Sequence, residues 1–113
     1  MGDQEHHATF ADRIEALLSN IEATIDRLSN EIDIDALRAG NVLTLTFENE
    51  HRIIINSQEA AQEVWVAARS GGFHFRLTDA TKRWSDTRSG EDLRVALGRL
   101  IEIETGVSPT FQL

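Results

Sequence analysis

The residues best suited to chemistry in this chain are the acidic side chains of its N-terminal half. The first fifty of the 113 residues carry eleven Asp and Glu against three Arg, so the whole net charge of −8 lies there. Carboxylates are oxygen donors for hard or borderline cations such as Fe, Mn, Mg and Ca. A one-sided acidic surface also attracts a basic partner and repels nucleic acid. The pattern therefore predicts binding of cations or of a basic protein surface.

Four of these acids share one face of a predicted helix. Apolar residues recur at three- and four-residue steps from residue 10 to about residue 28, which predicts an amphipathic helix with Thr9 as its N-cap. Carboxylates lie on the face opposite the apolar one, and further acids follow in the polar connection 29–41 and on the outward side of the first strand. We call the whole set the acidic ridge: Asp12, Glu15, Glu22, Asp26, Glu31, Asp33, Asp35 and Glu48.

The spacing of the ridge predicts weak and multiple cation sites. Helical neighbours three or four residues apart are separated by about 5 to 6 Å, so the carboxylates do not form a closed cage. The alternative is that the ridge is only the solvated face of a helix; against it, the chain has a single lysine, so charges of opposite sign are hardly mixed. His6 and His7 are further candidate ligands, with a flexible tail over residues 1–9 as the alternative.

Composition limits the class of protein and its compartment. The length predicts one domain over residues 1–113, and the hydrophobic content of 41% is that of a soluble globular protein. No apolar run approaches the roughly 20 residues of a membrane span, and the acidic N-terminus is unlike a secretory signal, so we expect a cytoplasmic protein without a membrane partner. The absence of cysteine leaves oxygen and imidazole as metal ligands. No nucleophile, base and orienting group stand together as a catalytic set.

The rest of the chain predicts an antiparallel sheet followed by a helix. Alternation in steps of two predicts strands over residues 42–48, 52–56, 63–68 and 73–78, with a short fifth strand around Trp84. The short turns between them imply a meander. A second helix is expected to open at Ser89 as N-cap, with Glu91 and Asp92 in its first turn, and to end at Gly106. The segment 107–113 should form a C-terminal tail that packs Phe111 and Leu113 against the helices.

The predicted fold is therefore α+β, a two-layer sandwich with the N- and C-terminal helices on one face of an antiparallel sheet of about five strands. The other face of such a sheet is solvated, so its exposed residues are candidates for contacts. If Val64 and Val66 face the helices, Trp65 points to the open side; core packing of Trp65 is the equal alternative. Trp84 is expected in the core.

An ordered set of motifs then resembles the bacterial branch of the frataxin family over about residues 10–106. The motifs are Asn56-x-Gln58, Val64-Trp65, Gly71-Gly72, Phe73-His74-Phe75, Trp84 and Asp86-x-Arg88-Ser89-Gly90. The resemblance implies the same fold. It also implies an iron-binding regulator of iron–sulfur cluster assembly that acts on the cysteine desulfurase complex.

The resemblance assigns roles by position. Fe²⁺ and Fe³⁺ would bind weakly to the acidic ridge, where other divalent cations can substitute, and the same ridge would dock on a basic surface of the desulfurase. The implied partner-binding residues are Glu22, Asp26, Asp33, Asp35, Asn56, Gln58 and Trp65. The iron–sulfur scaffold protein is a further candidate partner, and the chain is expected to be monomeric without iron, with iron-driven oligomers as an option.

Two departures from the family pattern bear on metal affinity. Glu22-Ala23 and Asp26-Arg27 stand where bacterial members often have paired acids, and Ala11 stands where members place a histidine. These changes predict a lower affinity for metal than is usual in the family. The leading hypothesis is a non-enzymatic, iron-responsive adaptor; the alternatives are an iron donor, or a weak ferroxidase that stores iron in oligomers.

Overall fold

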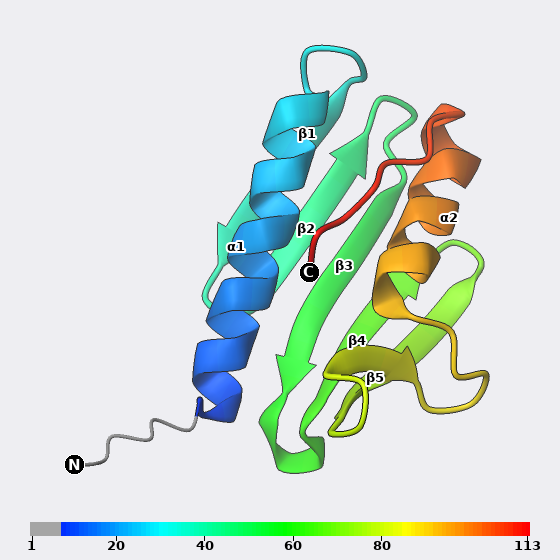
Figure 1. The fold of residues 1–113 in the computed structure, drawn as a ribbon. Coiled ribbons are helices and arrows are strands. Elements are labelled where there is room, and N and C mark those ends of the chain that lie inside the picture. The colour runs from blue at the N-terminus through cyan, green and yellow to red at the C-terminus, as the bar shows by residue number, and fades with distance from the viewer. Residues whose placement is uncertain (1–7) are drawn as a thin grey trace.

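The computed structural model describes residues 8–113, which form two helices packed on one face of a six-stranded antiparallel sheet (Figure 1). The strands lie in the sheet in the order in which they follow one another along the chain. This arrangement confirms the predicted α+β sandwich. The elements are α1 (Phe10–Leu28), β1 (Ile34–Ala39), β2 (Val42–Phe47), β3 (Arg52–Gln58), the short 3₁₀ helix η1 (Glu59–Ala61), β4 (Glu63–Ala68), β5 (Gly71–Thr78), β6 (Arg83–Asp86) and α2 (Leu93–Thr105).

Helix α1 begins with the predicted capping box. The side chain of Thr9 accepts a hydrogen bond from the backbone N–H of Asp12 at 3.1 Å, and the Asp12 carboxylate accepts one from the N–H of Thr9 at 3.1 Å. These bonds satisfy backbone donors that have no partner within the helix. The predicted tail falls mostly on residues 1–7, which lie outside the described residues.

The prediction of a polar connection over residues 29–41 is wrong, because residues 34–39 form the edge strand β1. This strand pairs with β2 along its whole length, from Ile34 opposite Phe47 to Ala39 opposite Val42. Of its six residues only Ile34 is buried, at 5% exposure. An edge strand that lies mostly in solvent needs no apolar alternation, so its sequence looks like a loop. Backbone pairing to β2 makes it a strand.

The core lies between the two helices and the sheet, and the C-terminal tail runs between α1 and α2 (Figure 1). Phe111 in this tail is buried, as predicted, and Leu113 packs against the core. Trp84 is also in the core, where its ring meets Phe10 edge to face with centroids 6.2 Å apart. The largest fully buried side chains are Phe75, Ile14, Leu18, Ile21, Ile25, Leu43, Leu45, Ile53, Ile55, Leu93, Leu97 and Ile101.

Helix α2 starts later than predicted, with Asp92 rather than Ser89 as its N-cap. The Asp92 carboxylate accepts from the backbone N–H of Arg94 at 2.8 Å, whereas the Ser89 hydroxyl accepts from the N–H of Glu91 in the preceding turn. Gly90 has a φ of +80°, a left-handed conformation that does not continue a helix. The two acids therefore precede the first turn instead of lying within it. The C-terminal end follows the prediction, since Gly106 caps it with a φ of +82°.

A nearly buried carboxylate joins the end of α2 to the turn between β2 and β3. The side chain of Glu104 is 4% exposed, accepts a hydrogen bond from Asn49 Nδ2 at 3.0 Å, and lies 2.8 Å from His51 Nδ1. The hydrogen bond from Asn49 is the main cause that lowers the pKa of Glu104, and His51 and Arg69 add to it against the effect of burial. The charged carboxylate thus holds three segments of the fold together.

Replacing Glu104 by Gln should lower the free energy of unfolding at pH 7 by about 1–2 kcal/mol, because hydrogen bonds to a charged acceptor are the stronger ones. A lowered folded-state pKa means that the carboxylate stabilises the fold above its ordinary value of 4.5, and that this contribution is lost as the pH falls through the folded-state pKa. Urea unfolding between pH 7 and pH 3 should show the difference from the parent protein shrinking below pH 4.5.

The matched control is Glu102→Gln, which removes the same charge from an exposed position on the same helix. It should change the free energy of unfolding by less than about 0.5 kcal/mol. Equal losses in the two variants, or a Glu104→Gln loss independent of pH, would contradict a stabilising carboxylate at this position.

Candidate cation- and partner-binding surfaces

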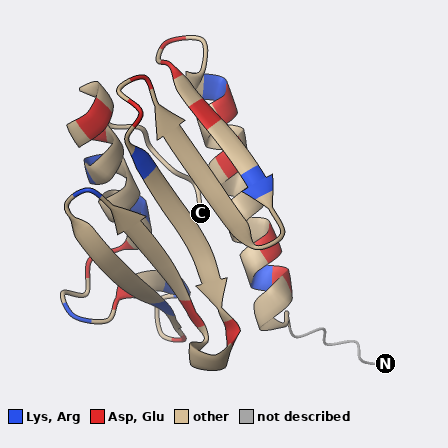
Figure 2. Ribbon diagram, turned by 180° about the vertical axis from the view of Figure 1, so that it is seen from behind, with Lys and Arg blue, Asp and Glu red and all other residues tan. Residues whose placement is uncertain are grey.

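The acidic ridge follows α1, the loop after it and the edge strand β1, which lie side by side (Figure 2). Seven of its eight carboxylates are exposed, and Glu22 is half-buried. One oxygen of Asp12 is engaged in the capping box. A groove of about 550 Å³ between α1 and β1 is lined by residues that include Glu22, Asp26 and Asp35. Glu22 and Asp26 thus border this groove from α1, and Asp35 borders it from β1.

The sheet part of the ridge lies around the edge of β1, not along α1. Ile34 is buried and Arg38 contacts α1, so alternation places Asp35 on the strand side that faces away from the helices. Ile34 pairs with Phe47 at the end of the ladder, and Asp33 and Glu48 directly adjoin this last pair. The ridge thus bends around the sheet edge, from helical carboxylates to a group on the first two strands.

A positive charge from β1 lies within the helical part of the ridge. Arg38 Nη2 is 2.6 Å from Glu15 Oε1, and Arg38 Nη1 is 3.3 Å from Glu22 Oε1. The hydrogen bond from Arg38 is the main cause that holds the pKa of Glu15 below its usual value, and the Ser19 hydroxyl contributes. Sequence reasoning missed this contact because it took residue 38 as part of a loop. A strand assignment would have placed Arg38 on the helix side by alternation.

The described residues offer exposed carboxylates but no preformed metal cage. Among residues 8–113 no three Asp, Glu or His side chains are grouped so that they could hold a metal ion. Separate, hydrated carboxylates bind hard cations through one or two ligands each, with water completing the coordination. The chemistry of the ridge therefore fits weak cation binding. The assignment of ridge residues as ligands stays a prediction, and His6 and His7 lie outside the described residues.

A second surface lies on the open face of the sheet around Trp65. Val64 and Val66 are buried at 1% exposure, so Trp65 faces away from the helices, which decides between the two alternatives that the sequence left open. Its ring stacks on His74 with centroids 4.2 Å apart and planes 6° apart. Across the strands, Trp65 is paired with Asn56, whose side-chain oxygen accepts from Gln58 at 3.1 Å. The sheet register therefore brings the three predicted contact residues together.

Glu63 anchors this surface and was not predicted from the sequence. Its side chain is 10% exposed, and its two oxygens accept from Trp65 Nε1 at 2.9 Å and from Arg76 Nη2 at 2.6 Å. The bond from Trp65 is the main cause that lowers the pKa of Glu63, with Arg76 and His74 contributing. The sequence signal was Glu63 two residues before Trp65, on the same side of one strand. We call this group the Trp65 patch: Asn56, Gln58, Glu63, Trp65, His74 and Arg76.

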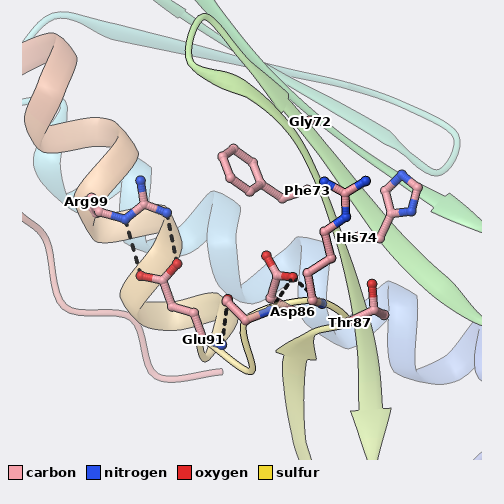
Figure 3. A pocket seen from close by; sticks show the side chains of 9 residues that line it. Gly72, Phe73, His74, Asp86, Thr87, Glu91 and Arg99 are labelled. Atoms are coloured by element: carbon pink, nitrogen blue, oxygen red, sulfur yellow. Dashed lines mark hydrogen bonds and ion pairs between the residues drawn. The ribbon is translucent and has the colours of Figure 1, made fainter.

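A pocket of about 350 Å³ lies beside the patch, between β5 and the loop that precedes α2 (Figure 3). Arg99 in this pocket binds Glu91 through two hydrogen bonds of 3.2 and 2.8 Å, and its guanidinium lies 5.6 Å from the centroid of the Phe73 ring. The backbone N–H of Thr87 donates to the carbonyl of His74 at 2.9 Å. The Glu91–Arg99 pair therefore joins the loop to α2, and the Thr87 N–H joins the loop to His74 in β5.

The comparison with known proteins decides the family. The model of the frataxin-like domain matches residues 3–107, nearly the whole chain. This chain belongs to the frataxin-like family. It is 53% identical over 98 residues to the iron-sulfur cluster assembly protein CyaY of Ralstonia nicotianae, covering 85% of each chain. It is 43% identical over 103 residues to the CyaY protein of Burkholderia mallei, covering 90% of this chain and 94% of the relative.

Solved structures of frataxins have the same fold. The frataxin of Psychromonas ingrahamii superposes with a TM-score of 0.83 at 30% identity, over 92% of this chain and 95% of that one. The trimeric frataxin of Saccharomyces cerevisiae, solved in complex with ferrous iron, gives a TM-score of 0.75 at 23% identity, over 94% and 93% of the two chains. This second likeness bears on the fold alone. Within residues 8–113, neither helix of this frataxin is long and apolar enough to span a membrane.

Replacing Glu63 by Ala should free the indole of Trp65, because Glu63 is the acceptor for its N–H. We expect the Nε1–H resonance of Trp65 to shift and its exchange with water to become faster in NMR spectra. Trp84, in the core, serves as the internal reference and should not change. The control variant Glu59→Ala removes an exposed acid close in sequence. Unchanged exchange at Trp65 in Glu63→Ala would show that Glu63 does not anchor the patch.

Proposed function

We propose that this frataxin is a non-enzymatic, iron-binding regulator of iron–sulfur cluster assembly that binds the cysteine desulfurase through its acidic ridge. The observation that carries the proposal is the exposure of the ridge along one edge of the fold, with its carboxylates free of a closed cage. The relatives at 53% and 43% identity are named as iron–sulfur cluster assembly proteins, which supports the same process for this chain.

Iron is the cargo or effector of the ridge in this proposal. Fe²⁺ or Fe³⁺ would be held by the exposed carboxylates around the groove between α1 and β1, with Asp26 and Asp35 as the central ones. Both are cations that accept oxygen ligands, and other divalent cations can substitute for them. Because each carboxylate stands apart, binding is weak and depends on the summed negative field.

The same field would guide a basic partner. Complementary charge speeds association and sets the orientation of a complex more than it adds to affinity, and it is screened by salt. Iron on the ridge neutralises part of this field and so changes how strongly the desulfurase docks. The Trp65 patch, on the adjacent open face of the sheet, would supply a second contact surface for a partner. The iron–sulfur scaffold protein is a further candidate partner.

The alternative activities receive less support from the geometry. A ferroxidase needs ligands held in a preorganised arrangement, and residues 8–113 contain no group of three such side chains. An iron donor would bind iron at the same ridge. It would differ from the adaptor only in transferring that iron to another protein. A monomer without iron and a cytoplasmic location both stay predictions.

Reversing two central charges should weaken the desulfurase complex. For the double variant Glu22→Lys with Asp26→Lys we expect about 30-fold weaker binding at low salt, taking roughly 0.5 kcal/mol for each of the four units of charge changed. The salt dependence of the affinity should become flatter, as measured by calorimetry at several ionic strengths. The control is Asp79→Lys with Glu102→Lys, which makes the same charge change at exposed sites outside the ridge. Equal effects of both double variants would argue against docking by the ridge.

An NMR titration with Fe²⁺ without oxygen, followed by the desulfurase, tests the shared surface. We expect signals from residues 15 to 35 to respond in both steps, because the two ligands use the same carboxylates. Iron oxidation rates measured with and without the protein should be equal if the protein is an adaptor. Iron that leaves these residues untouched would rule out the metal-binding part of the proposal.

A further inference from the structure

Arg38 makes an unusually complete set of contacts for a side chain next to solvent. Its Nη2 contacts Glu15 Oε1 at 2.6 Å, and its Nη1 lies 3.3 Å from Glu15 Oε2, from Ser19 Oγ and from Glu22 Oε1. Its Nε donates to the carbonyl of Gly40 at 3.1 Å. The side chain is 18% exposed, whereas that of Glu15 is 66% exposed. The guanidinium is therefore largely shielded from solvent, and the exposed carboxylate of Glu15 covers it.

The contacts of Arg38 span two turns of α1. Glu15 and Glu22 are seven residues apart and lie on the same face of the helix, and one guanidinium reaches both from the neighbouring strand. Arg presents its donors in a rigid planar fork, which suits contacts to two carboxylates at once. The pair of acids then carries a net charge of −1 together with Arg38, not −2. The attraction of this half of the ridge for a divalent cation is reduced accordingly.

We propose that Arg38 is a built-in cation that closes the Glu15–Glu22 half of the ridge to metal and directs cations to the half around Asp26 and Asp35. This inference rests on the proposed function of the ridge as an iron-binding surface. A metal ion can use Glu15 and Glu22 together only after it displaces the guanidinium, so the arginine-bound and metal-bound states exclude each other. Arg38 thereby acts as a specificity-determining residue for where and how tightly the ridge binds metal.

The displacement would also loosen the edge of the sheet. Only Ile34 among the six residues of β1 is buried, so β1 contributes little to the core. Arg38 is its charged connection to α1 through Glu15 and Glu22. Metal bound at these two carboxylates removes that connection, and the amide protons at the Ala39 end of β1 then exchange faster with water. Metal bound around Asp26 and Asp35 leaves the connection in place.

The test compares the parent protein with Arg38→Gln and with the control Arg27→Gln. The control removes the same charge from α1, where Arg27 donates to Thr24 Oγ1 at 3.2 Å and not to Glu15 or Glu22. Mn²⁺ is the paramagnetic probe of position in NMR spectra, and Fe²⁺ without oxygen is the probe of affinity. In the parent protein we expect Mn²⁺ to broaden signals near Asp26 and Asp35 before those of Glu15.

In Arg38→Gln the signals of Glu15 and Glu22 should broaden together with those of Asp26, and the affinity for Fe²⁺ should rise about fivefold, since two exposed ion pairs no longer compete. Arg27→Gln should show a smaller rise and the parent order of broadening. Arg38→Lys keeps the charge without the fork and should fall between the parent and the Gln variant. If Arg38→Gln does not fold, Arg38→Lys is compared with the parent protein in its place.

The outcomes separate this inference from the proposed function. If the parent protein binds Fe²⁺ on the ridge and Arg38→Gln behaves like Arg27→Gln, the role of Arg38 is refuted and the metal-binding ridge stands. If only Arg38→Gln binds Fe²⁺, the closing of Glu15 and Glu22 by Arg38 is supported, whereas the direction of cations to Asp26 and Asp35 and iron binding by the natural chain are both refuted. If neither binds, both fail.

Discussion

The packing of the apolar face of α1 on the sheet is the contact on which the rest of the structure depends. Ile14, Leu18, Ile21 and Ile25 are buried at 1% exposure or less. Burial of this one stripe fixes the rotation of the helix about its axis, because the apolar residues occupy a single face. The carboxylates on the opposite face must then point to solvent beside the edge strand. The position of the acidic ridge is thus a consequence of core packing.

The one-sided core has a second consequence, for the open face of the sheet. Both helices cover the same face, so the other face stays in solvent (Figure 1). An exposed indole on such a face is held in place here by polar neighbours: Glu63 binds the Trp65 N–H, and His74 stacks on the ring. The indole is therefore held by a hydrogen bond and by a stacked ring although it is exposed. A preorganised surface of this kind loses little conformational entropy when a partner binds.

The ridge combines attraction for cations with internal neutralisation. Carboxylates gathered on one face of a helix repel each other, and Arg38 offsets part of that repulsion at Glu15 and Glu22. Among the carboxylates of the ridge, Glu15 and Glu22 are the ones that contact Arg38 in the described structure. The structure thus shows one part of the acidic surface neutralised by an internal arginine, at Glu15 and Glu22.

The sequence predicted the parts of this protein that depend on periodicity and on local capping. The helix from Phe10 to Leu28, its capping box, the Gly106 cap and the burial of Trp84 all follow from such signals. The edge strand β1 could not be predicted in this way, because only backbone pairing with β2 makes it a strand. The start of α2 was placed three residues early, since Gly90 adopts a left-handed conformation that no composition rule specifies.

The acidic ridge and the Trp65 patch show the same difference between what the sequence predicted and what only the fold decided. The sequence alone determined which residues carry charge and that the carboxylates of α1 lie opposite its apolar face, because the helical period is a local property. Only the tertiary structure decided that Arg38 reaches Glu15 and Glu22, and that Glu63 gathers Trp65 and Arg76. The contacts of Arg38 with Glu15 and Glu22, and of Glu63 with Arg76, join residues on different elements. Their geometry depends on strand register and on helix packing, which a single sequence pattern does not encode.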